Sequence, residues 1–97
     1  MYDMVLNLIP RDIHQRITAS GISQRLGIKG AEVRRYINQM RSSGIPVCSD
    51  QKGYYISSNE EHVKTQIASM ENHISAMQNA IGGLNLFLSG QGAYINT

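Results

Sequence analysis

The chain has 97 residues, with nine Lys and Arg, seven Asp and Glu, one Cys and no Trp. A chain of this length is expected to form one small domain with at most one appendage, because small domains bury only about 60% of their unfolded surface. A large enclosed active site is therefore not expected. The single Cys48 excludes both an internal disulfide and a cysteine-based zinc site.

The distribution of apolar and charged residues predicts a cytoplasmic protein without a membrane partner. No apolar run approaches the roughly 20 residues that span a bilayer, and the first residues lack the charged and apolar regions of a signal peptide. Residues 1–57 carry eight basic and four acidic groups, whereas residues 58–97 carry one and three. This asymmetry is typical of a nucleic-acid-binding head joined to a tail with another role.

Two short helical patterns open the chain. Residues 2–9 place apolar side chains at three- and four-residue spacing, which predicts an amphipathic helix that Pro10 ends. After a polar connection, the apolar spacing predicts a second helix over 19–26. Thr18 is a suitable N-cap for this helix, and Gly27 can adopt the left-handed conformation that ends it.

A third helix and a β-hairpin are predicted next. Residues 31–42 have apolar side chains on one face and arginines on the others. β-Prone runs over 45–49 and 54–57 flank a turn-forming segment, in which Gly53 is suited to a positive φ. The combination predicts a helix followed by an antiparallel hairpin.

A long helix is expected to begin at the capping-box sequence Ser58-Asn-Glu-Glu61, in which the Ser58 hydroxyl accepts from the Glu61 amide. Its apolar residues recur at alternating four- and three-residue intervals, which is the heptad pattern of a coiled coil. Gly82 and Gly83 each lower the helix propensity by roughly 1 kcal/mol, so the last turn is expected to fray, bend or end there. The heptad residues are Val63, Ile67, Met70, Ile74, Met77, Ile81, Leu84 and Leu88.

The heptad stripe is narrower than the face by which a helix packs on its own domain, and it therefore predicts self-association. β-Branched residues at a positions favour two strands. The a positions hold Ile67, Ile74, Ile81 and Leu88, and the d positions hold Val63, Met70, Met77 and Leu84. The flanking positions carry almost no complementary charge, so an antiparallel pair or a higher-order bundle stays open.

Together these patterns predict a mainly α-helical protein with a small β-hairpin. The chain is expected to have a head at 1–57, an oligomerisation helix at 58–88 that resembles a coiled-coil strand, and a flexible tail at 89–97. We expect the chain to act as a dimer or a higher oligomer.

The head resembles the winged helix-turn-helix family, which includes the N-terminal domain of the biotin operon repressor and many small bacterial and phage regulators. Four features carry the resemblance in order over residues 19–57. They are the turn glycine Gly27, the helix core Val33-Arg-Arg-Tyr-Ile37, the exit Gly44-Ile-Pro-Val47 and the wing strand Gly53-Tyr-Tyr-Ile56.

The resemblance implies that the helix at 31–42 lies in the major groove of double-stranded DNA. Arg can pair with guanine and Asn with adenine, and one of the two adjacent arginines would face a phosphate instead. Lys52 would contact the DNA backbone or minor groove, and Thr18 or Arg25 a flanking phosphate. The residues nearest the base edges would be Lys29, Gly30, Ala31, Arg34, Arg35 and Asn38. The implied function is that of a sequence-specific transcriptional regulator, encoded by a phage or mobile element, that reads a palindrome as a dimer.

Three features depart from the family pattern. Lys29 and Gly30 stand where a Ser or Thr cap is usual, which weakens the helix start by about 1 kcal/mol. Gly21 stands where a Glu would complete a capping box with Thr18, and Glu32 places a negative charge beside the DNA face. Glu32, the weak cap and the modest net charge of +4 on residues 1–57 favour a second hypothesis, an adaptor or inhibitor that binds a host or phage protein instead of DNA. RNA binding by the same helix ranks third.

No pattern for catalysis or metal binding is recognised. His14, His62 and His73 are dispersed and share no ligand spacing, and no glycine-rich phosphate loop is present. Cys48 lies in a predicted strand, where a small buried hydrophobic residue is expected. We therefore expect neither enzyme activity nor a cofactor.

Overall fold

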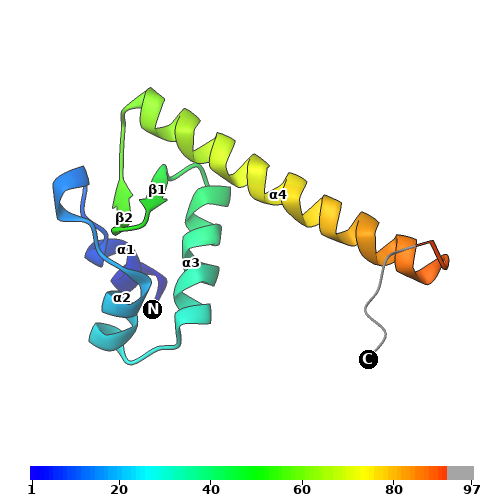
Figure 1. The fold of residues 1–97 in the computed structure, drawn as a ribbon. Helices are drawn as coiled ribbons and strands as arrows, with labels where there is room; N and C mark the ends of the chain where they lie inside the picture. Colours follow the sequence, from blue (N-terminus) through cyan, green and yellow to red (C-terminus); the bar gives the residue numbers. More distant parts are fainter. Residues whose placement is uncertain (92–97) are drawn as a thin grey trace. The chain divides into compact units, whose positions relative to one another are not determined.

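The computed structural model describes residues 1–91 and contains two units, Met1–Gln66 and a second that begins at Ile67 (Figure 1). The fold class is the predicted one, mainly helical with an antiparallel hairpin and a long C-terminal helix. The compact unit extends past the predicted head boundary at residue 57. In chain order the elements are α1 (Tyr2–Leu8), the 3-10 helix η1 (Ile13–Gln15), α2 (Ala19–Leu26), α3 (Gly30–Ser42), β1 (Val47–Asp50), β2 (Gly53–Ile56) and α4 (Glu60–Leu88).

Several element ends differ from the predicted ones for local reasons. α1 stops at Leu8, because Ile9 precedes Pro10 and a residue before proline is pushed out of the helical region. The predicted strand over 45–49 begins later, since the Ile45 amide donates to the Met40 carbonyl at 3.0 Å in the turn that ends α3. The polar connection before α2 contains η1, which no apolar periodicity indicated.

Both ends of α2 form as predicted. The Thr18 hydroxyl accepts from the Gly21 amide at 2.9 Å, and Gly27 ends the helix at φ 66°. A Cβ on Gly21 would lie 3.2 Å from the Thr18 hydroxyl, so close packing at the start of α2 favours glycine at this position. The Ser23 hydroxyl donates to the Ile28 carbonyl, so the turn into α3 is held from within.

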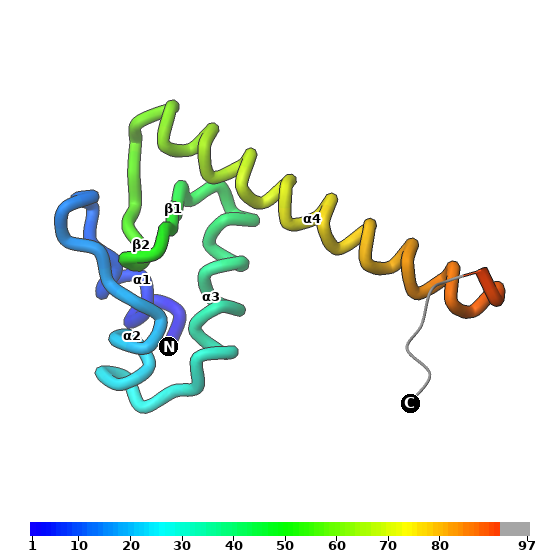
Figure 2. Tube along the Cα trace, viewed as in Figure 1, coloured from blue at the N-terminus to red at the C-terminus, as the bar shows by residue number. Residues whose placement is uncertain are grey.

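The core of the first unit lies where α1, α2, α3 and the hairpin meet (Figure 2). α3 contributes three side chains at helical spacing, and α1 and the hairpin close the other sides. Cys48 is also buried, as predicted for a small hydrophobic residue. The core cluster consists of Val5, Ile9, Ile22, Val33, Ile37, Met40, Val47 and Ile56.

The hairpin has a two-residue turn, with Asp50 opposite Gly53 in the register. Gly53 adopts φ 129°, and a Cβ there would overlap the Ile17 carbonyl group. This close approach exists because Ile17 and Tyr54 exchange two backbone hydrogen bonds, at 3.1 and 2.7 Å. The outer edge of β2 therefore binds the segment that leads into α2. The Ile56 amide extends this contact by donating to the Pro10 carbonyl at 2.8 Å.

The predicted capping box at Ser58 is wrong. α4 begins at Glu60, and the Asn59 side chain accepts from the Glu61 amide at 2.9 Å. Asn59 is held in place because its own amide donates to the Ser57 hydroxyl at 3.1 Å. The Glu61 carboxylate pairs with Lys64 at 3.6 Å instead of reaching back to the helix start.

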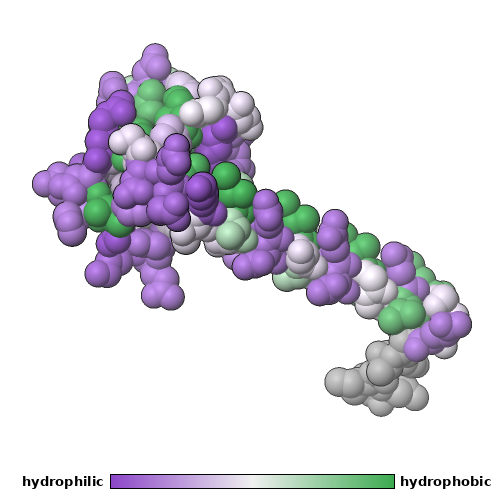
Figure 3. Space-filling model, turned by 90° about the horizontal axis from the view of Figure 1, so that it is seen from above, coloured by the Kyte–Doolittle hydropathy of each residue, from purple (hydrophilic) through white to green (hydrophobic). Residues whose placement is uncertain are grey.

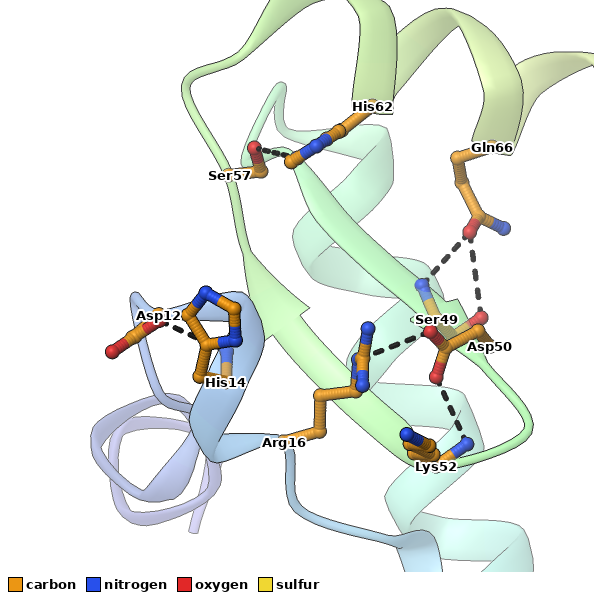
Figure 4. Close-up of polar contacts among 9 residues, drawn as sticks. All are labelled: Asp12, His14, Arg16, Ser49, Asp50, Lys52, Ser57, His62 and Gln66. Atoms are coloured by element: carbon orange, nitrogen blue, oxygen red, sulfur yellow. Dashed lines mark hydrogen bonds and ion pairs between the residues drawn. The ribbon is translucent and has the colours of Figure 1, made fainter.

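The first turns of α4 bind the hairpin within the first unit (Figure 4). The Gln66 side-chain oxygen accepts from the Ser49 amide at 2.8 Å. The His62 ring lies 2.9 Å from the Ser57 hydroxyl and edge-on to Tyr55. These contacts explain why the compact unit ends at Gln66.

The second unit consists of the rest of α4 and the turn that follows it. The helix does not end at Gly82 and Gly83 but continues to Leu88. Gly90 at φ 79° then closes it, with its amide bound to the Phe87 carbonyl at 3.0 Å. Part of the predicted flexible tail, residues 92–97, lies outside the described residues.

Candidate nucleic-acid interface

α3 separates a buried face from an exposed one. Val33, Ile37 and Met40 are spaced at four and three residues and lie in the core, at most 1% exposed. The residues between them point away from the core. Of the six residues predicted to lie nearest the base edges, Gly30 is half-buried and Lys29 is exposed, and neither lines the hollow described next. The other four, Ala31, Arg34, Arg35 and Asn38, are all exposed.

These four residues also line one open hollow on the surface of the first unit. Tyr2 of α1 borders the hollow, so it is not made by α3 alone. The hollow combines guanidinium, amide and hydroxyl groups, which are the side chains that read base edges and bind phosphates. Sequence reasoning missed four of the lining residues, namely Tyr2, Gln39, Ser42 and Ser43.

The two adjacent arginines have different surroundings. The Arg35 guanidinium lies 5.1 Å from the centre of the Tyr36 ring, a cation–π geometry that limits its freedom. Tyr36 in turn meets Tyr2 edge-on, with ring centres 6.3 Å apart. Arg34 makes no such ring contact among the described residues. Arg35 is therefore the more strongly oriented of the pair.

The start of α3 has the predicted weak cap. Lys29 occupies the N-cap position with no side-chain hydrogen bond, and Gly30 is the first helical residue. The amides at this end therefore lack a side-chain acceptor within the described residues, and a helix N-terminus favours negative charge. Glu32 is half-buried and does not line the hollow, so it lies off the face that carries Arg34 and Arg35.

Two other arginines of the first unit are used inside the fold. Arg41 donates from Nε to the Val47 carbonyl at 2.8 Å, and burial lowers the pKa of its guanidinium. Arg16 pairs with Asp50 at 3.0 Å (Figure 4). Its guanidinium also lies over the Tyr55 ring. The exposed basic residues with no ion pair within residues 1–91 include Arg25, Lys29, Arg34, Arg35 and Lys52.

The remaining predicted contact residues lie apart from the hollow. Lys52 is in the hairpin turn, where its amide donates to the Asp50 carboxylate at 2.9 Å and leaves its ammonium group exposed. Thr18 is exposed, but its hydroxyl already accepts from Gly21. Arg25 is exposed in the last turn of α2. None of these three lines the hollow of α3.

The predicted oligomerisation residues are arranged along α4. Val63 is half-buried in the first unit, next to Pro46 and Lys64 in a small apolar hollow. The other seven are exposed in the second unit, from 37% for Met70 to 79% for Leu88.

The described residues hold no cluster of three or more His, Cys, Asp or Glu side chains suited to a metal ion. None of the helices between residues 1 and 91 combines the length and apolar character needed to cross a membrane. Burial raises the pKa of the Cys48 thiol, which disfavours the reactive thiolate.

Comparisons of the chain with models of known protein families, with curated proteins and with solved structures found no match.

Proposed function

We propose that this protein is a sequence-specific, double-stranded-DNA-binding regulator of transcription that acts as an oligomer. In this proposal α3 enters the major groove, with Asn38 and one of the adjacent arginines, Arg34 or Arg35, toward the base edges and the other arginine toward a phosphate. The hairpin turn carries Lys52 to the DNA backbone or the minor groove. Lys29 and the first amides of α3 contact phosphate, as helix N-termini commonly do.

The observation that carries this proposal is that some arginines are bound within the fold, whereas others are exposed on α3. Arg16 and Arg41 are bound within the fold, whereas Arg34 and Arg35 are exposed together beside Asn38. An arginine that only supports the fold has partners in the fold. Two adjacent exposed arginines on a helix that follows a tight glycine turn are suited to an external anionic partner.

The first test is a titration of the protein against duplex DNA by fluorescence anisotropy at several salt concentrations. Phosphate neutralisation makes log K fall with log salt by about 0.9 per contact. A steep salt dependence, with tighter binding to selected sequences than to random duplex, is the expected result. Absence of binding at low salt would overturn the proposal.

A matched pair of charge reversals locates the interface. Arg34→Glu is expected to weaken binding of a selected duplex by about 10- to 100-fold, as for loss of a base-reading arginine at about 1–3 kcal/mol. Arg11→Glu changes the charge equally at an exposed residue that does not line the hollow. Equal losses in both variants would show that net charge, not the face of α3, determines binding.

The adaptor hypothesis is favoured by one observation, the row of exposed aliphatic side chains on α4, which a helix of another protein could cover. The two functions respond differently to Arg34→Glu. A DNA-binding regulator loses DNA and keeps its protein partners. An adaptor that uses α4 alone keeps its partner and shows no affinity for DNA in either form.

A further inference from the structure

α4 carries a row of exposed aliphatic side chains at heptad spacing, which we call the seam; Leu86 and Phe87 are also exposed but lie outside this row. Figure 3 shows apolar side chains recurring along one side of this helix between polar ones. The seam has no buried member within the described residues. Its seven residues are Ile67, Met70, Ile74, Met77, Ile81, Leu84 and Leu88.

The seam is long enough to form a specific interface. From Ile67 to Leu88 an α-helix extends about 33 Å at 1.5 Å per residue. A stable interface buries about 800 Å² per partner, and a seam of seven large side chains with its flanking residues supplies an area of this order. Contiguous exposed apolar surface of this kind marks a site of protein association.

We propose that the seam is covered by the same seam of a second copy of this chain, with the two helices parallel and in register. This inference rests on the proposed function, for which it names the oligomeric partner and its geometry. The complex is a two-stranded coiled coil with a two-fold axis along the helices.

The distribution of β-branched residues favours this geometry. In the heptad register every isoleucine of the seam, Ile67, Ile74 and Ile81, is at an a position. The d positions hold unbranched or γ-branched side chains, Met70, Met77 and Leu84. In parallel coiled coils, isoleucine at a with leucine-like residues at d favours two strands over three or four, so this distribution supports the two-stranded state.

The exposure of the side chains along α4 independently favours a parallel pair in register. A parallel pair in register matches every seam residue with its own copy, so all seven exposed side chains are covered. An antiparallel pair matches a with d positions, for example Ile67 with Leu84, and places Leu88 opposite Val63. Val63 is already half-buried against its own unit, whereas Leu88 is 79% exposed and needs a free partner.

Charge does not oppose the association of identical helices. Between Ile67 and Leu88 the sequence contains one charged residue, Glu71, and one histidine, His73. Bringing two copies together therefore places no rows of like charge side by side, which would otherwise disfavour a homodimer.

Disulfide cross-linking in the absence of DNA tests the orientation. In a full-length Cys48→Ala background, Leu84→Cys is expected to form a covalent dimer on mild oxidation, because parallel d positions face each other. In an antiparallel pair the two introduced sulfurs would be separated by about 25 Å along the helix, roughly 17 residues at 1.5 Å each. Asn79→Cys, on the outward side of the same helix, is the matched control and is expected to stay free of covalent dimer under oxidation.

An antiparallel pair would give a different pattern of disulfide cross-links. When chains carrying Ile67→Cys are mixed with differently tagged chains carrying Leu84→Cys, an antiparallel pair yields a mixed covalent dimer. That result, without a dimer of Leu84→Cys alone, would overturn the proposal.

Sedimentation equilibrium of the unmodified chain provides the stoichiometry. The expected mass is twice that of the chain at micromolar concentration, and Ile74→Glu is expected to shift it to one chain, whereas Asn79→Glu is not. A monomer or a trimer of the unmodified chain would each refute two-stranded pairing. Because no DNA is present, these outcomes are independent of the anisotropy titration.

Discussion

α3 and the part of α4 beyond Gln66 are both amphipathic, but the apolar residues of α3 are buried and those of α4 are exposed. Val33 and Ile37 are at most 1% exposed, whereas Ile67, Ile74 and Ile81 are between 50% and 56% exposed. The side chains are of the same kind, so hydrophobicity alone does not explain the difference. α3 is packed against α1, α2 and β1, whereas α4 beyond Gln66 has no buried residue.

The first unit therefore completes its own core, and the second does not. One consequence is that identical mutations should act on folding in one unit and on association in the other. Matched substitutions in the two units test this difference.

The largest effect is expected from a cavity in the first unit. Ile37→Ala removes a fully packed side chain from α3 and should lower the free energy of unfolding by about 2–5 kcal/mol. Ile74→Ala makes the same change on the seam. It should leave the unfolding of the first unit within about 0.5 kcal/mol of the parent and weaken self-association instead.

Urea denaturation at a fixed low protein concentration, with sedimentation at higher concentration, checks both members of this pair. The contrast between the units is lost when Ile74→Ala destabilises the first unit as much as Ile37→Ala does.

A second, smaller contrast uses two glycines. Gly53→Ala places a methyl group against the Ile17 carbonyl at a positive φ, and should destabilise the first unit by about 1–3 kcal/mol. Gly82→Ala meets nothing within 4 Å and should stabilise the helix by about 1 kcal/mol.

Circular dichroism through thermal unfolding measures both glycine variants. A lower melting temperature for Gly53→Ala and greater helicity for Gly82→Ala are expected. Equal behaviour of the two variants would mean that the hairpin does not hold Gly53 against Ile17.

The smallest effect concerns pH. Burial raises the pKa of the Cys48 thiol and of the Tyr55 hydroxyl, so both groups hold their protons more strongly in the folded state than in the unfolded chain. Their contribution to the free energy of unfolding is therefore fully present below the unfolded thiol pKa of about 8.5 and is lost as the pH rises above it. Cys48→Ala should remove the first part of this loss, and a parent protein whose stability stays constant from about pH 8 to 10.5 would contradict the assignment. Denaturant titrations at each pH supply the measurement.

Local signals in the sequence were sufficient for much of the fold. Thr18 and Gly27 were predicted as the ends of α2, and Gly53 as a positive-φ residue, because each depends on its immediate neighbours. The start of α4 was predicted one residue early, since Ser58 and Asn59 are both good caps. The Ser57 hydroxyl, which binds the Asn59 amide, decides between them.

The candidate site was predictable only where it follows helical spacing. Arg34, Arg35 and Asn38 share a face of α3 as the sequence indicated, and Gln39 could have been added by the same periodicity. Tyr2 could not, because it comes from α1, which is distant in the sequence and meets α3 only through the tertiary fold. The structural roles of Arg16 and Arg41 also depend on tertiary contacts.

The backbone hydrogen bonds around the hairpin affect the tendency of the protein to aggregate in concentrated solution. Strands with open edges can recruit strands from other molecules and start fibrillar growth. Here Ile17 and Pro10 occupy the outer side of β2, while Gln66 and Arg41 bind the Ser49 amide and the Val47 carbonyl of β1. Among residues 1–91 these contacts occupy backbone groups on both edges of the hairpin, which reduces the number left free for strand addition.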